Sequence, residues 1–409
     1  NTAVGATAGD AITTASYNVA VGLDALGQTT TGGANVAIGY QAMEGDVDGD
    51  GADNVAIGHR AMLANVSPSK NVAIGDSAMR AMNGTANGIA DCVAIGANAF
   101  YGDATNTTTG TNGTVAIGKD SLKALTTGSK NIAIGFEAMN DMQTGTNNIA
   151  LGYQAMDVLQ GGDSSGGIAA SANGGNHNIA IGTDAMGAVE GYRNNTEIDG
   201  NIAIGTNALL GGDLGNNNNY DFVGNIAIGY NAVDATGAAQ PMTGTIGIGY
   251  ESLTALTSGA HNVAVGYQSL HDVNTGGSNV ALGNYAGDNI TDGTENTCIG
   301  YAARTDDASA TNQTVIGRAT TGVADNSVTL GNADVTAVYM AQDGHATINS
   351  GGLAVGYGTT TPDAEIKLKN SGLEGGDNQV DIAFATQHNG GGIRYKTTGT
   401  GATDQILSF

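Results

Sequence analysis

The residues best suited to chemistry form a short acidic loop near the start of the chain. Asp46-Val47-Asp48-Gly49-Asp50-Gly51 places carboxylates at alternate positions, and Asp53 follows. Alternate carboxylates around glycines are the arrangement with which the first half of an EF-hand loop binds Ca²⁺. Ile57 occupies the place of the bidentate Glu, so the loop is not an EF-hand. We interpret Asp46, Asp48, Asp50 and Asp53 either as a partial calcium site or as an acidic glycine-rich turn.

A second group combines aromatic rings with amides and carboxylates. It comprises Tyr192-Arg193-Asn194-Asn195 and the run 216–219, which is followed by Tyr220-Asp221-Phe222. Rings beside Asn and Asp suit carbohydrate, because the ring stacks on the sugar and the polar groups bond its hydroxyls. The candidate ligand-binding residues are Tyr192, Arg193, Asn195, Asn218, Tyr220 and Asp221. The alternative is that these loops are solvated decorations.

Catalytic signatures are missing from the sequence. The six histidines show no zinc-site spacing, and we find no nucleophile elbow, phosphate loop or paired carboxylates. We therefore expect no enzyme and no cofactor beyond the possible calcium. The enzyme class with most physical sense is a β-helix polysaccharide lyase or hydrolase, whose carboxylates lie on a solenoid face.

Composition narrows the choice of partners. The chain has 409 residues, 67 glycines, three prolines and a formal net charge of −25, which makes nucleic acid an unsuitable partner. No apolar run is long enough for a membrane-spanning helix. Cys92 and Cys298 fall at different positions of the repeat described below, about a dozen repeats apart. No intrachain disulfide is therefore expected. The sequence opens inside a repeat at Asn1, so we expect a start methionine, leader or anchor to have been removed or left out.

One short phrase, Asn35-Val36-Ala37-Ile38-Gly39, recurs from the start of the chain as far as Leu330. Aligned on the glycine, it occurs eighteen times, and nine of the seventeen intervals equal the one from Gly22 to Gly39, a period of 17. We number positions relative to this glycine. Asn fills position −4 in thirteen copies, and position −1 is always Val, Ile or Leu. Self-similarity at a short fixed period predicts a solenoid.

The columns of this repeat predict how one coil is built. β-branched residues at positions −3 and −1 favour a short strand, and stacked coils lie about 4.8 Å apart. We expect the Val and Ile columns to form the core, the Asn side chains to form an amide ladder, and the glycine to turn the chain with positive φ. Six of the ten methionines fall at position +4, where we expect core filler. Asn35, Ile38, Gly39 and Met43 represent these columns.

Alanine at position −2 would then form a flat apolar stripe on the opposite face. Exposed apolar stripes of this length are typical of interfaces, so we expect parallel copies of the chain to associate, most simply as a homotrimer.

The repeat resembles the head of trimeric autotransporter adhesins, and similar repeats occur in tail fibres of phages. The resemblance covers about residues 1–330 and implies a homotrimeric left-handed parallel β-roll. The period of 17 is longer than is usual in those heads, and no coiled-coil stalk or membrane anchor is visible in the sequence.

The seven intervals longer than 17 all lengthen the same part of the coil, between position +4 and the next Asn. The lengthened segments therefore leave one edge of the rod, and four consecutive ones between Gly152 and Gly249 predict a collar. In solenoids, the face that carries insertions is often the binding face.

After Leu330 the period ends. Residues 351–368 contain Gly358-Thr359-Thr360-Thr361-Pro362, which is similar to a segment of phage tail fibres and spikes that often precedes a self-cleaving chaperone, although Tyr357 departs from that pattern. If a chaperone once followed, proteolysis could have produced the end at Phe409.

Together these features predict an all-β protein: a homotrimeric parallel β-solenoid of about eighteen coils at 1–331 and a small β-rich trimeric tip at 332–409. The expected function is an extracellular phage tail fibre or spike, located on the virion tail, that binds a glycan or protein receptor on a host cell. The alternative is a bacterial trimeric adhesin head or a cell-surface filament subunit.

Overall fold

The computed structural model of the chain describes residues 1–45, 50–65, 67–81, 89–102, 110–158, 175–189, 197–211, 221–234, 242–336 and 338, and the backbone alone of 160–161, 190–191, 393–395 and 405–407. The chain divides into two compact units, Asn1–Val338 and Tyr339–Phe409.

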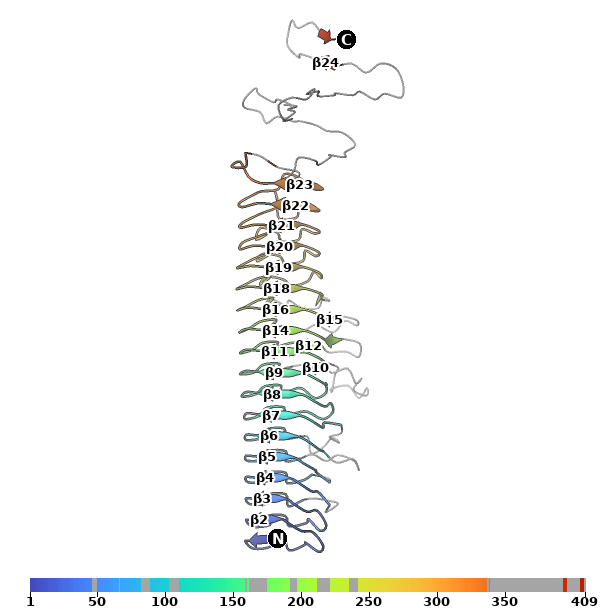
Figure 1. The fold of residues 1–409 in the computed structure, drawn as a ribbon, viewed down its shortest axis with the longest axis vertical. Helices are drawn as coiled ribbons and strands as arrows, with labels where there is room; N and C mark the ends of the chain where they lie inside the picture. The colour runs from blue at the N-terminus through green and yellow to red at the C-terminus, as the bar shows by residue number, and fades with distance from the viewer. Residues whose placement is uncertain are drawn as a thin grey trace, which may run out of the picture. The chain divides into compact units, whose positions relative to one another are not determined.

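The first unit is a parallel β-solenoid. Every copy of the repeated phrase forms one short strand, and the strands stack into an eighteen-stranded sheet (Figure 1). All pairs are parallel and in register, so Val36, for example, lies between Val19 and Val55. The predicted all-β parallel β-solenoid is confirmed: the described residues contain strands and turns and no helix.

The strands of this sheet share the sequence Val/Ile-Ala-Val/Ile/Leu with few departures. They are β1 (Thr2–Val4), β2 (Val19–Val21), β3 (Val36–Ile38), β4 (Val55–Ile57), β5 (Val72–Ile74), β6 (Val93–Ile95), β7 (Val115–Ile117), β8 (Ile132–Ile134), β9 (Ile149–Leu151), β11 (Ile179–Ile181), β14 (Ile202–Ile204), β16 (Ile226–Ile228), β18 (Ile246–Ile248), β19 (Val263–Val265), β20 (Val280–Leu282), β21 (Thr297–Ile299), β22 (Gln313–Ile316) and β23 (Ser327–Leu330).

Two smaller sheets lie beside the main one, in the part of the rod with the longest connections. The first pairs β10 (Gln160–Gly161) with β12 (Glu190–Gly191), and the second joins β13 (Ile198–Asp199), β15 (Phe222–Val223) and β17 (Met242–Thr243), all in parallel.

The repeated glycine turns the chain out of each strand. Gly135 has φ +143°, and a Cβ placed on it would lie 2.0 Å from the carbonyl oxygen of Gly152 in the next coil. The rest of the turn is also tight, since positions +2 and +4 are left-handed in nearly every coil, as at Gln41 and Met43. Glycine is thus required both by the backbone angle and by the glycine of the coil above it.

The core has the opposite composition to the one predicted from the strand pattern. Ala37 and its equivalents at position −2 are fully buried, whereas Val36 is half-buried and Ile38 is 37% exposed. The prediction that the branched aliphatics point inward, with Ile38 in the core, is therefore wrong, and so is the prediction of an exposed alanine stripe. The two faces of the strand were separated correctly but assigned the wrong way round.

The narrow interior of the coil explains this reversal. Position −2 packs against the side chain at position +4 of the preceding coil, as Met43 and its equivalents fill the space. At Gly247, the one described copy without a side chain at −2, an added Cβ would lie 2.6 Å from Cγ2 of Val233. Position −2 is therefore narrow: it is alanine in most coils, with Cys298 and Val315 the larger buried exceptions, and the branched residues at −3 and −1 face outward.

Two further interior columns were not foreseen. In several of the shorter coils, position +7 is buried, as at Leu125, Met142, Leu256, Val273 and Ile290. In several longer coils, a large apolar residue at position −7 is buried. These residues are Ile89, Ile198, Phe222 and Met242. In the coil from Gly182 to Gly205, Val189 at +7 and Ile198 at −7 are both buried, so residues on either side of a connection contribute to the core.

The second unit has two described strands. β24 (Ile393–Tyr395) and β25 (Gln405–Leu407) form an antiparallel pair. Residues 381–384, where we expected another strand, lie outside the described part, as do residues 351–368. In the part of the chain that is described, no helix has the length and hydropathy needed to cross a bilayer.

Substituting the repeated glycine tests the stacking. Gly135→Ala places a methyl group into the backbone of the next coil and forces a side chain into a left-handed conformation, so we expect a loss of several kcal/mol at that junction. Hydrogen exchange of the strand amides at 132–134 and 149–151 should rise by at least tenfold. Gly110→Ala is the matched control, since Gly110 also has positive φ but no atom lies within 4 Å of its added Cβ. Equal exchange in both variants would contradict this packing.

Candidate binding surfaces and the asparagine ladder

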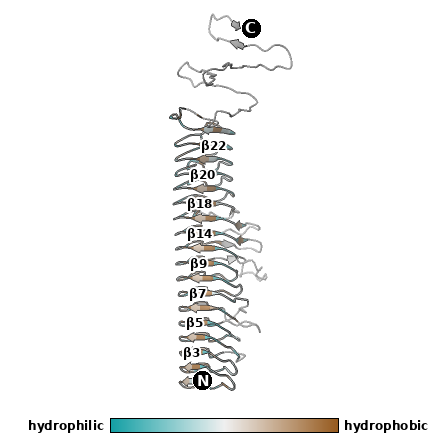
Figure 2. Cartoon of the chain, in the orientation of Figure 1, coloured by the Kyte–Doolittle hydropathy of each residue, from teal (hydrophilic) through white to brown (hydrophobic). Residues whose placement is uncertain are grey.

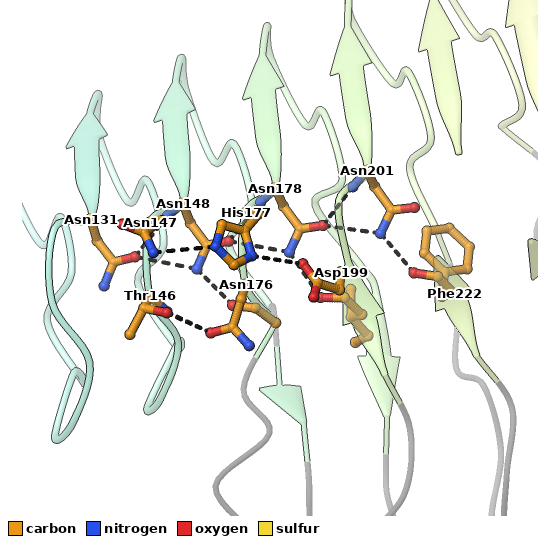
Figure 3. Close-up of polar contacts among 12 residues, drawn as sticks. Asn131, Thr146, Asn147, Asn148, Asn176, His177, Asn178, Asp199, Asn201 and Phe222 are labelled. Atoms are coloured by element: carbon orange, nitrogen blue, oxygen red, sulfur yellow. Dashed lines mark hydrogen bonds and ion pairs between the residues drawn. The ribbon is translucent and has the colours of Figure 1, made fainter. Parts of the chain in front are cut away.

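The asparagines at position −4 form a buried ladder that runs along the strand stack. In Figure 3, Asn131, Asn148, Asn178 and Asn201 lie one after another. Oδ1 of Asn148 accepts hydrogen bonds from the backbone N (3.0 Å) and from Nδ2 (3.1 Å) of Asn178. The backbone N of Asn148 donates in turn to Oδ1 of Asn131. Each amide therefore bonds to the coils on both sides.

The second donor of each Asn side chain fixes the connection as it returns to the rod. Nδ2 of Asn148 donates to the carbonyl of Gly175 (2.7 Å), and Nδ2 of Asn201 donates to that of Phe222 (2.7 Å). The acceptor is always the residue at position −7 of the next coil, both for short coils (Asn131 to Gly145) and for longer ones. We call this contact the asparagine clamp, because wherever position −4 is Asn it holds the last point of the connection, irrespective of the length of that connection.

The ladder is interrupted at three described positions in the middle of the rod. Cys92 keeps a weaker form of the clamp, with Sγ 3.3 Å from the carbonyl of Thr111. Thr114 and Thr245 have buried hydroxyls without a protein partner. Burial raises the pKa of the Cys92 thiol to about 11, and that of Cys298 to about 12. Both cysteines are free and buried, so neither is a reactive thiol.

A three-stranded sheet lies where three of the four long connections of the predicted collar rejoin the rod. β13, β15 and β17 stack in register, with Phe222 buried between Ile198 and Met242. Beside this sheet, His177 lies between neighbouring coils, with Nδ1 3.0 Å from Oδ1 of Asp199 and Nε2 3.4 Å from Nδ2 of Asn147 (Figure 3).

Only one of the six predicted ligand-binding residues can be located. Asp221 is exposed directly before β15, and its carbonyl accepts a hydrogen bond from the backbone N of Met242 (3.1 Å). Tyr192, Arg193, Asn195, Asn218 and Tyr220 lie outside the described residues. The structure therefore places the positions where these connections rejoin the rod, and the glycan site remains a proposal.

The candidate calcium loop is only partly described. Asp46 and Asp48 fall outside the described residues, and Asp50 and Asp53 are exposed. Among described residues, no three His, Cys, Asp or Glu side chains gather closely enough to hold a metal ion.

The outward face of the main sheet is a surface that sequence analysis did not identify. Positions −3 and −1, which we call the outer columns, are half-exposed or exposed in every coil, and none is buried. Figure 2 shows the hydrophobic colour following the strands along the rod. The signal was present in the sequence, since thirty-three of these thirty-six residues are Val, Ile or Leu and none is charged.

Position +1 is the first residue after the glycine turn; it is half-exposed or exposed in every coil and carries many aromatic rings. We call it the aromatic column. Its rings stack on the equivalent rings of neighbouring coils: Tyr230 on Tyr250 and Tyr250 on Tyr267, with ring centroids 5.2 Å apart in both pairs. Phe136 and Tyr153 (5.5 Å), and Tyr40 and His59 (5.4 Å), form two more stacks.

Two acidic side chains of the solenoid, Asp157 and Asp120, have pKa values shifted in opposite directions. Burial, together with the carboxylates of Asp141, Glu137 and Asp184, raises the pKa of Asp157 to about 6. Burial alone would also raise the pKa of Asp120, but bonds from Lys119 and Asn98 hold it below its usual value. The charge of Lys119 is thus balanced within its own chain.

Comparison with known proteins gives no family assignment. No protein-family model matches the chain, and no curated protein sequence is significantly similar to it.

Removing one ladder amide tests the asparagine clamp. Asn148→Ala deletes four buried hydrogen bonds of the Asn148 side chain to nitrogen and oxygen partners, so we expect a local loss of about 4 kcal/mol at roughly 1 kcal/mol per bond. Amide exchange should increase in the coils on both sides of residue 148. Asn274→Ala, which truncates an exposed amide, should leave exchange unchanged. A uniform small effect in both variants would show that the ladder contributes little.

Proposed function

We propose that the chain is a subunit of an extracellular fibre, in which parallel copies associate through the outer columns and the long connections bind a surface. The observation that carries this proposal is an uncharged, half-exposed Val/Ile/Leu stripe along the whole solenoid of a chain whose net charge is −25.

The dimensions of the stripe favour a stable interface. Eighteen strands at the usual spacing extend over about 85 Å, and a three-residue strand is about 10 Å wide. The product, roughly 850 Å² per chain, reaches the area that one partner contributes to a standard protein interface. It also exceeds the apolar patch of an ordinary monomer.

A second copy of the chain is the partner that fits this surface best. The partner must be apolar, straight and as long as the rod, and its side chains must repeat at the same spacing. The same stripe on another copy meets all of these requirements. Three parallel copies around one axis are the arrangement implied by the resemblance to trimeric adhesin heads and phage fibres, and they close without leaving a free stripe.

The long connections are the part of the fibre that we propose to contact a receptor. They rejoin the rod at one column, position −7, so they project from the same edge of consecutive coils. Three symmetric copies would present each connection three times, and weak contacts to a host-surface glycan or protein receptor would add up to strong attachment. A calcium ion in the loop containing Asp46, Asp48, Asp50 and Asp53 would stiffen one such connection.

The sequence after the solenoid favours a phage tail fibre or spike on the virion tail, because residues 358–362 resemble a segment of such proteins. A bacterial adhesin head or cell-surface filament subunit is the second candidate, since it would use the same stripe and connections. A polysaccharide-degrading β-helix enzyme is less well supported, because the sequence shows no paired carboxylates in a plausible cleft. We propose a role without catalysis.

Charges on the stripe test the assembly. Leu151→Lys with Ile204→Lys places charges at two exposed outer-column positions, where a single chain tolerates them but an interface does not. Sedimentation should change from about three times the 40.5 kDa chain mass to the mass of one chain, with the β circular dichroism retained. Gln28→Lys with Asn274→Lys, at exposed positions outside the outer columns, should remain assembled. A wild-type chain that sediments as a monomer would overturn the proposed assembly.

Replacing a connection tests the receptor contact. A variant with Gly-Ser in place of residues 212–220 keeps Phe222 and Asn225, so its solenoid should assemble normally. On an array of bacterial surface glycans and on a panel of bacterial cells, we expect it to lose at least tenfold of the binding of the wild-type protein. Substituting residues 235–240 in the same way tests a second connection of the predicted collar, and Asn274→Ala, which leaves every long connection intact, is the control. Undiminished binding by both loop variants would place the receptor site elsewhere.

A further inference from the structure

We propose that the aromatic column sets the axial register between neighbouring copies of the chain. This inference rests on the proposed assembly through the outer columns. It identifies the feature that decides which coil of one copy lies beside which coil of the next.

The outer columns cannot supply that information. Positions −3 and −1 are Val, Ile or Leu in almost every coil, and Thr2, Thr297 and Thr314 near the two ends are the departures. Moving one copy along the axis by one coil, about 4.8 Å, would exchange one branched aliphatic for another along most of the rod. A uniform strand face specifies register weakly and permits slippage.

The aromatic column differs from the outer columns because its residue type changes in blocks. Aromatic rings occupy 40 and 59, 136 and 153, 230 to 267, and 301 at position +1, and Tyr285, at position +2, lies edge-on between Tyr267 and Tyr301. Between these blocks lie Asp76, Ala97, Lys119, the pair Thr183 and Thr206, and Asn284. The unequal block lengths and gaps form a pattern that matches itself only when both copies are at the same height.

The geometry of the rings favours contact between copies at their edges. Tyr250 is stacked on both sides, by Tyr230 and Tyr267 at interplanar angles of 15° and 5°, so its two ring faces are occupied within its own chain. The residue is nevertheless 43% exposed. The accessible part of the ring is therefore the edge, which suits edge-to-face contact with a ring of a neighbouring copy and leaves no free face for a stacked sugar.

Two of the three Lys, Arg, Asp and Glu residues of the column have partners in their own chain, and the third, Arg318, is exposed near the end of the solenoid. Lys119 pairs with Asp120 and lies over the ring of Phe136, with Nζ 5.1 Å from the ring centroid. Asp76 lies 3.3 Å from Nδ1 of His59. With these partners in the same chain, equal residues at equal heights repel one another little. A one-coil shift would instead place Thr183 beside Tyr153, and Asn284 beside Tyr267, and would lose ring contacts.

The register can be read by zero-length cross-linking between isotopically distinct chains. Unlabelled and ¹⁵N-labelled chains are refolded together, and tyrosine radicals are generated with a ruthenium photo-oxidant and persulfate. Each cross-link is a carbon–carbon bond between two phenol rings, with loss of one hydrogen from each ring to the oxidant. Mass spectrometry then separates mixed-isotope cross-links, which join two chains, from those formed within one chain.

We expect the mixed cross-links to join equal residues, such as Tyr230 to Tyr230 and Tyr267 to Tyr267. The triple variant Thr183→Tyr, Thr206→Tyr and Asn284→Tyr fills the gaps and makes the column aromatic from 136 to 301. In this variant, mixed cross-links between unequal coils should become common. Thr183→Val, Thr206→Val and Asn284→Ala alter the same sites but keep the blocks, and should preserve the equal-residue pattern.

The outcomes separate the two proposals. A monomer in sedimentation overturns the proposed assembly itself. An assembled protein without mixed tyrosine cross-links would show that the aromatic column does not face a neighbouring copy. Equal-residue cross-links that persist in the gap-filled variant would show that another feature sets the register. Sedimentation and circular dichroism of both triple variants identify any loss of folding or assembly before the cross-links are compared.

Discussion

The hydrogen bonds of one buried amide per coil hold this structure together. Each clamp joins three segments: the neighbouring asparagine, the backbone that enters the strand, and the carbonyl at position −7 of the next coil. A coil with a three-residue strand buries little apolar surface by itself, so bonds between coils must supply much of the order. Because the amide is fully buried, its bonds are not exchanged for water.

The thinness of the coil determines the chemistry of its surface. The strand contributes mostly alanine methyls to the interior, which is filled from the turns by larger side chains such as Met43 and Val233, and the β-branched residues at positions −3 and −1 face outward. Strand propensity and core packing therefore place their preferred residues on opposite faces. The result is an apolar exterior on an acidic rod, from which the proposed association of copies follows.

Periodicity was sufficient to predict the solenoid, the ladder of Asn side chains and the turn at glycine, because each depends on spacing along the chain. It could not tell which strand face is inside, since Val36 and Ala37 are both apolar and the answer depends on the width of the coil. The core residues Phe222 and Ile198 were also missed, because they lie outside the repeated phrase and are recognised only by their distance before the next glycine. The proposed receptor-binding residues belong to connections whose sequences share no pattern with one another, so periodicity does not identify them.

Because the connections return to the rod at the same position, the length of a connection can change without changing the register of the strands. When a segment grows, its ends stay at the same two places, and the entropy of closing a loop rises by only about 0.6 kcal/mol for each doubling of its length. The interval from Gly152 to Gly182 is almost twice as long as that from Gly135 to Gly152, yet the strands of both are stacked in the same register. In such a scaffold, one connection can be replaced by another of different length or sequence, while the spacing of the coils and the outer columns stay the same.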